Sequence, residues 1–147
     1  MIEYGLLASV DERDVVHVQS LLTQLSKNAP VHSLKSLREV MRSHMIFVAR
    51  DTRDAHHPII GMATLVIIRQ LVGVRGRVED VVVDEAYRRH GVARMLMQNL
   101  HRQAIMGGVP LLALSVRAEN DAAGELYRSL GYNKGHLEIY TIDLSKS

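Results

Sequence analysis

The stretch VEDVVVDEAYRRHGVAR, residues 78–94, decides the fold. Its first six residues are mostly apolar and predict a strand, and a helix is expected to begin near Gly91. Helix N-termini carry free N–H groups and a partial positive charge, so they bind phosphate well. Gly91 would let a ligand approach the backbone closely, while Arg88 and Arg89 add positive charge. The stretch therefore indicates either a phosphate-binding turn or an ordinary connection with solvated arginines.

Hydrophobic patterning predicts the elements on both sides of this stretch. Upstream we expect a strand over 2–9, a helix capped by Asp11, a shorter helix capped by Ser33, and strands over 45–49, 59–68 and 78–83. Gly73 and Gly76 should bracket the second turn of this antiparallel meander. Downstream we expect a helix from Gly91 to Gly107, a strand covered on both faces over 110–116, a helix over 120–130 and a last strand over 136–144.

Composition narrows the class of protein. The chain has 147 residues, which suits one domain over 1–147, and a net charge of +2, too small to indicate nucleic-acid binding. It has no cysteine, which excludes disulfides, thiolate metal sites and a cysteinyl acyl intermediate. The longest mostly apolar run, residues 59–68, is half the ~20 residues of a membrane helix. We expect a cytoplasmic α/β (α+β, mixed-sheet) protein that binds neither membrane nor metal, the eight histidines being scattered without metal-ligand spacing.

Two spaced motifs carry a resemblance to a known family. The first is Arg88-x-x-Gly91-x-Ala93, and the second is Asn120-x-x-Ala123-x-x-x-Tyr127-x-x-x-Gly131-Tyr132. In spacing and in element order the chain resembles the GNAT superfamily of acyl-CoA-dependent N-acetyltransferases. The resemblance implies a GNAT-like fold, in which the meander is followed by a βαβ unit with splayed central parallel strands.

The resemblance also implies acetyl-CoA as co-substrate and roles for individual residues. Backbone groups of Val81 and Val83 would pair with the pantetheine arm, and loop amides would hold the pyrophosphate. Asn120 would hydrogen-bond the pantetheine, and Tyr127 would protonate the departing thiolate. The full implied cofactor site is Val81, Val82, Val83, Arg88, Arg89, His90, Gly91, Val92, Ala93, Arg94, Asn120, Ala123 and Tyr127.

The chemistry further requires a neutral amine, and hence a base. With no cysteine, direct attack in a ternary complex is the simplest route. Glu79 and Asp80 lie just before the expected thioester position, and adjacent strand residues point to opposite faces. We favour Glu79 slightly, because regular alternation puts it on one face with Val81 and Val83. Each carboxylate could instead pair with an arginine, and a water chain could replace both.

The acceptor stays open at this stage. Residues 76–83, GRVEDVVV, are similar to the matching stretch of glucosamine-6-phosphate N-acetyltransferases within the family. Amino sugar phosphates, other small amines, peptide N-termini and lysine side chains are all candidate acceptors, and a homodimer is an open alternative to a monomer. A non-catalytic acyl-CoA-binding module is the competing hypothesis.

Overall fold

The computed structural model describes residues 1–146, in two units that are treated separately: Met1–Ser115 and Val116–Ser147. The first unit contains β1 (Ile2–Leu6), α1 (Glu12–Leu25), α2 (Leu34–Ser43), β2 (His44–Asp51), β3 (Ile59–Gln70), β4 (Gly73–Val83), the 3₁₀ turn η1 (Glu85–Tyr87), α3 (Val92–Met106) and β5 (Leu112–Ala113). The second contains α4 (Asp121–Ser129) and the 3₁₀ turn η2 (Leu144–Lys146).

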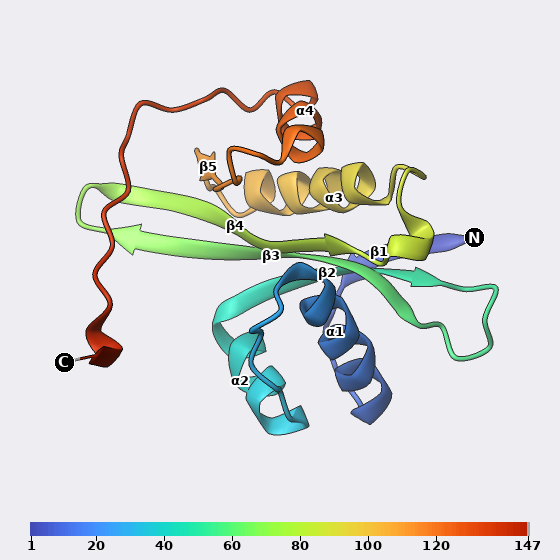
Figure 1. Ribbon diagram of the computed structural model, residues 1–147. Helices are drawn as coiled ribbons and strands as arrows, with labels where there is room; N and C mark the ends of the chain where they lie inside the picture. Colours follow the sequence, from blue (N-terminus) through green and yellow to red (C-terminus); the bar gives the residue numbers. More distant parts are fainter. Residues whose placement is uncertain (147) are drawn as a thin grey trace. The chain divides into compact units, whose positions relative to one another are not determined.

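The first unit is built on a mixed sheet with the order β1-β2-β3-β4-β5. Neighbours from β1 to β4 are antiparallel, whereas β5 returns through α3 to lie parallel to β4. α1 and α2 cover one face of the sheet and α3 covers the other (Figure 1). The predicted meander followed by a βαβ unit, and with it the α/β mixed-sheet class, is confirmed.

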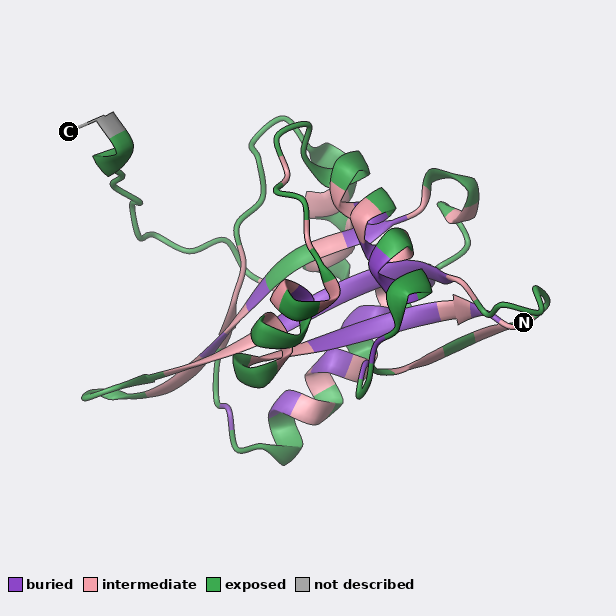
Figure 2. Cartoon of the chain, turned by 90° about the horizontal axis from the view of Figure 1, so that it is seen from below, coloured by how far each residue is buried: buried purple, intermediate pink, exposed green. Residues whose placement is uncertain are grey.

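Apolar residues fill both interfaces between the sheet and its helices, and the buried residues run along the strands (Figure 2). On the first face, Val18 and Leu21 of α1 and Leu37 of α2 join the core that includes Met62 and Val82. On the second face α3 packs directly onto the sheet at Gly61. A Cβ there would lie 3.2 Å from side-chain atoms of both Leu96 and Val92, so any larger residue would force these side chains to shift, and glycine allows the close approach.

The two N-terminal helices begin where their caps predict. The Asp11 side chain accepts a hydrogen bond from the Asp14 amide at 2.9 Å, and the Asp14 carboxylate accepts one from the Asp11 amide. Ser33 and Ser36 make the same reciprocal pair at the start of α2. Each pair satisfies two backbone donors that a helix start would otherwise leave free.

Three local predictions are wrong. Gly76 lies within β4, opposite Ile67 and Leu112, and not at the turn. The strand predicted over 110–116 shrinks to Leu112–Ala113, and its flank is exposed rather than covered on both faces, since Leu111 is 62% exposed. Residues 110–116 therefore have strand propensity, but only Leu112 and Ala113 pair with the neighbouring strand β4.

The last predicted strand, over 136–144, is also absent from the described residues, which are irregular up to η2. Its alternation is real, but Leu137 and Ile142 are 90% and 80% exposed. Strand structure depends on hydrogen bonding to a neighbouring strand as well as on propensity. No strand of the described chain pairs with this segment.

Candidate active site

The sheet opens between β4 and β5. The two strands pair only at Gly76–Leu112 and Arg77–Ala113, and the Gly76 amide donates to the Leu111 carbonyl at 2.8 Å. From Val78 to Val83 no described strand pairs with β4 on this side. Apart from the Val83 carbonyl, which accepts a hydrogen bond from the Arg88 side chain, the backbone there is available to pair with an extended ligand, as an added strand would.

The turn that follows β4 presents backbone amides. Arg89 and Gly91 both adopt left-handed conformations, with φ of 67° and 77°, and Gly91 is the N-cap of α3. As a result the amides of five consecutive residues, Arg89 through Ala93, have no hydrogen-bond acceptor within the described chain. A Cβ on Gly91 would have no atom within 4 Å, so the space above the turn is open. Partnerless amides at a helix N-terminus are suited to an anion.

The basic side chains around this turn differ in their hydrogen bonding and in their exposure to solvent. The Arg88 guanidinium folds back, its Nε donating to the Val83 carbonyl at 3.0 Å. Arg89 and His90 are exposed, whereas Arg94 is half-buried. The segment 88–94 thus combines free amides with nearby positive charge, and has no acidic side chain within it.

Contacts that the sequence motifs did not reveal hold the loop before this turn. The Asp84 amide donates to the Ile60 carbonyl at 2.8 Å, and the Glu85 amide donates to Gln24 Oε1 of α1 at 3.0 Å. The Tyr87 hydroxyl donates to Asp51 Oδ2 at 2.6 Å, across 36 residues of sequence. No short-range pattern signals these partners, because each depends on how distant segments pack.

A bulge in β4 changes which residues share a face. Val82 lies opposite Met62 and Glu79 opposite Thr64, so two residues, Asp80 and Val81, face Ala63 alone. Asp80 has a positive φ of 52°, a conformation that Asp tolerates better than most residues. Glu79 therefore shares the α1–α2 face with Val82. The prediction that it shares a face with Val81 and Val83 is wrong, because the extra residue reverses the alternation.

The two carboxylates lie in different electrostatic environments. Glu79 Oε1 is paired with Arg77 Nη2 at 2.9 Å, and the same guanidinium nitrogen donates to Ser115 Oγ at 3.0 Å. Asp80 makes no such pair among the described residues. Burial raises the pKa of the Asp80 carboxyl above its usual range and the Glu79 charge adds to this, while His44 and His32 act in the opposite direction. A partly desolvated carboxyl with a raised pKa is a candidate proton acceptor.

The valines of β4 contribute different atoms. The side chains of Val82 and Val83 are buried, and that of Val81 is half-buried. Their side chains therefore help to form the core, and what the strand offers a ligand is its open backbone edge.

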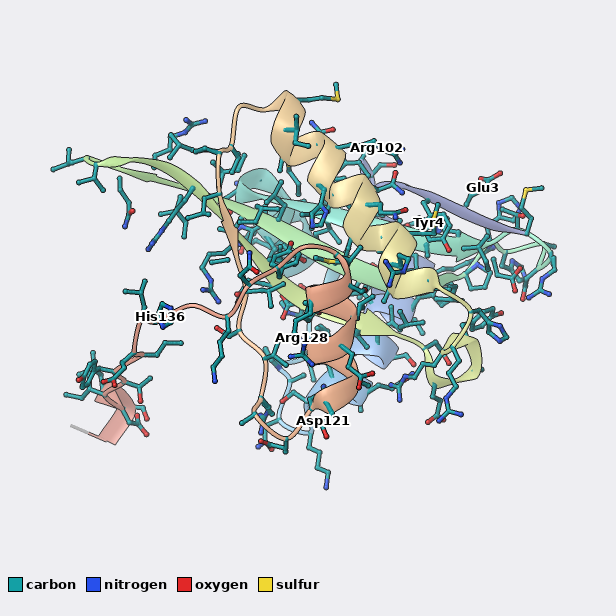
Figure 3. All side chains as sticks on the ribbon, turned by 90° about the horizontal axis from the view of Figure 1, so that it is seen from above. Glu3, Tyr4, Arg102, Asp121, Arg128 and His136 are labelled. Carbon is teal, nitrogen blue, oxygen red and sulfur yellow. The ribbon has the colours of Figure 1, made fainter. Side chains whose placement is uncertain are left out.

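The second unit carries the second motif. Asn120 caps α4, its Oδ1 accepting a hydrogen bond from the Ala123 amide at 3.1 Å, and leaves its side-chain NH₂ as a donor. Asp121 and Arg128 (Figure 3) lie in the first and last turns, where their charges complement the helix dipole.

Tyr127, on α4, packs edge-to-face against Tyr132, with ring centroids 5.7 Å apart. Burial raises the pKa of Tyr127, and burial together with Tyr127 raises that of Tyr132 to about 12. Both hydroxyls therefore stay protonated at neutral pH, so each can donate a proton.

Other features of the described residues bear on the function. A hollow of about 500 Å³ lies between the β1–α1 connection and α2, lined in part by Arg38, Arg42 and His44, and includes no residue of the β4–α3 turn. The described chain has no cluster of three metal-ligating side chains and no helix long and apolar enough to cross a membrane.

Comparison with known proteins shows which family the sequence matches. The model of the acetyltransferase (GNAT) family matches residues 18–132. A [ribosomal protein bS18]-alanine N-acetyltransferase of Salmonella typhimurium is 40% identical over 67 residues, 46% of this chain and 45% of that protein. A Drosophila melanogaster protein named a probable glucosamine 6-phosphate N-acetyltransferase is 30% identical over 126 residues, 82% of this chain and 55% of that protein. The chain thus spans about half the length of the curated relatives it matches.

Solved structures share the fold at low sequence identity. An acetyltransferase of Trypanosoma brucei superimposes with a TM-score of 0.80 at 24% identity, covering 98% of this chain and 100% of that one. Glucosamine-6-phosphate N-acetyltransferase of Arabidopsis thaliana gives 0.79 at 20% identity, covering 97% and 98%. The resemblance drawn from the two sequence motifs is confirmed, and the chain belongs to the acetyltransferase (GNAT) family.

Proposed function

We propose that this chain transfers an acetyl group from acetyl-CoA to a primary amine, by direct attack within a ternary complex. One observation carries the proposal: the unpaired edge of β4 leads directly into a turn whose amides, Arg89 through Ala93, have no acceptor among the described residues. An extended polar arm ending in a pyrophosphate has the chemistry to use both. Proteins of this family use acetyl-CoA, and AAC(6')-Iy, which shares the fold, was solved with a CoA-containing bisubstrate analogue.

In this proposal the first unit holds the co-substrate by its backbone. The open edge at Val81, Val82 and Val83 pairs with the pantetheine arm. The amides from Arg89 through Ala93 hold the pyrophosphate, and the helix dipole and the nearby side chains of Arg88 and Arg94 favour its charge.

The second unit supplies the remaining groups. Asn120 donates from its free NH₂ to the pantetheine, and Ala123 and Tyr127 contact the thioester end. We propose that both units belong to one acetyltransferase domain, since a single family model runs through 18–132 without a break.

The base in this proposal is Asp80 rather than Glu79. Glu79 is neutralised by Arg77, whereas the raised pKa of Asp80 brings its proton affinity closer to that of a working general base. The acceptor ammonium gives its proton to Asp80, directly or through water. The neutral nitrogen then bonds to the acetyl carbon as the carbon–sulfur bond breaks, and Tyr127 gives its proton to the departing thiolate. The nitrogen loses its second proton, which returns through water to the Tyr127 phenolate, and Asp80 releases the first proton to solvent.

The acceptor that we favour is a small amine or an amino sugar phosphate. The support is the name of the Drosophila relative together with the similarity of residues 76–83. A peptide or protein amine is the alternative, supported by the bacterial relatives named for ribosomal protein alanine. A cytoplasmic location and a homodimer stay predictions.

Calorimetric titration tests the proposal, using acetyl-CoA, CoA, ADP and pantetheine in turn. Saturable binding of acetyl-CoA, with contributions from both the pyrophosphate and the arm, is the expected result. Release of CoA thiol is then followed with a panel of amino sugar phosphates, polyamines, amino acids and peptides. No binding of acetyl-CoA refutes the proposal, and tight binding with no turnover on any amine favours the non-catalytic module.

A further inference from the structure

A buried carboxylate at the end of β2 is fully satisfied by hydrogen bonds. Asp51 is 4% exposed, and it accepts four hydrogen bonds. Oδ1 accepts from the backbone N–H and the Nε of Arg53, both at 3.0 Å. Oδ2 accepts from Arg53 Nη2 at 2.8 Å and from the Tyr87 hydroxyl at 2.6 Å. Three of these bonds lie within the β2–β3 hairpin, and only the fourth leaves it.

That fourth bond reaches the loop between β4 and α3. The other ties described above, at Asp84 and Glu85, hold the first residues of the loop. Tyr87 is further along, two residues before Arg89, where the left-handed turn begins. Its hydroxyl ties the loop to the β2–β3 hairpin, whereas the next side chain, that of Arg88, bonds back to Val83 at the end of β4. A short O–H···O⁻ bond of this kind is stronger than a neutral one.

We propose that Tyr87 is a positioning residue for the co-substrate, with Asp51 as its anchor in the β2–β3 hairpin. This inference rests on the proposed function. The bond fixes the place where the loop turns, so the amides of Arg89 to Ala93 are already convergent before a pyrophosphate arrives. Without this bond the loop samples other conformations, and the conformational entropy lost when the ligand orders the loop lowers the affinity. Tyr87 itself contacts no reacting atom.

The test is Tyr87→Phe, which removes one oxygen and leaves the ring. Asp51 keeps its three bonds to Arg53, so the hairpin is undisturbed. We expect the dissociation constants of CoA and ADP to rise about tenfold, the loss typical of a hydrogen bond to a charged group. Pantetheine lacks the pyrophosphate, and its affinity should change by less than about twofold on the same reasoning. In turnover, KM for acetyl-CoA should rise while kcat stays the same.

Tyr4→Phe is the matched control. Tyr4 is a half-buried tyrosine on β1 (Figure 3), and its hydroxyl makes no hydrogen bond with any described residue. This variant should bind all three ligands like the wild type. In an Asp51→Asn background, Tyr87→Phe should have a smaller effect, because the charge that strengthens the bond is already gone.

Each other outcome is decisive. Unchanged ADP affinity in Tyr87→Phe overturns the inference and leaves the proposed function standing. Equal losses for ADP and pantetheine overturn it too, since they would indicate a general structural change. A wild-type protein that binds neither CoA nor ADP overturns the proposed function and the inference together.

Discussion

Gly91 offers the sharpest test of where the pyrophosphate lies. Its backbone is left-handed, with φ of 77°, yet a Cβ would have no atom within 4 Å. A substitution there therefore meets backbone strain and no steric clash. That strain is about 1–2 kcal/mol for a non-glycine residue. For a chain of 147 residues it corresponds to a fall in Tm of roughly 2–8 °C. Gly91→Glu and Gly91→Gln should both fold, and both should lose this stability.

The two variants differ only in charge, and the charge sets the expected loss of affinity. At a separation of ~5 Å and an effective dielectric constant of ~20, two unit charges repel by about 3 kcal/mol. We therefore expect Gly91→Glu to bind acetyl-CoA about 100-fold more weakly than Gly91→Gln. Calorimetry at low and high salt measures this, and the difference should shrink as salt screens the charge.

Gly108, at the other end of α3, provides the control. It also has a left-handed backbone, with φ of 74°, and no atom within 4 Å of a Cβ. Gly108→Glu brings the same strain and the same charge, and should leave acetyl-CoA affinity at the wild-type value. Equal affinities in Gly91→Glu and Gly91→Gln would refute the placement of the pyrophosphate at this turn.

Three further perturbations address chemistry and stability. Tyr127→Phe should lower kcat at least ~100-fold, the lower end of what a general acid contributes, with CoA affinity retained in calorimetry. Asp80→Asn should remove the fall in kcat/KM at low pH, because Asp80 accepts a proton only when it is deprotonated. In the wild type this fall should lie above the usual pH range of an aspartate, since burial raises the pKa of Asp80. Glu79→Gln should keep the fall. Leu100→Ala, at a fully buried position of α3, should lower the free energy of unfolding by about 2–5 kcal/mol in chemical denaturation; a cost below ~1 kcal/mol would contradict the packing described for α3.

Local features were predictable because their causes are local. The caps at Asp11 and Ser33 follow from a side chain and an amide three residues apart, and the helix after Gly91 follows from one turn of sequence. The spacing of the two motifs was enough to place the chain in its family.

Features that depend on distant partners could not be read in the same way. The bulge at Asp80 contains no glycine, the residue that most often signals a bulge in a sequence, so the assumption of regular alternation placed Glu79 on the wrong face. The bond between Tyr87 and Asp51 joins segments that only the folded sheet brings together. The segment 136–144 has strand propensity, but whether propensity becomes structure is decided by a neighbour.

The brevity of β5 has a consequence for handling the protein. A bare strand edge is a template on which another chain can pair, and proteins commonly protect such edges with charges, proline or a covering loop. Along Val78 to Val83 the edge of β4 is mostly valine, and no described strand covers it. If pantetheine occupies this edge, the ligand also shields it from other chains. Preparations stripped of CoA should then aggregate faster on concentration than preparations saturated with it, so light scattering during purification would report on occupancy.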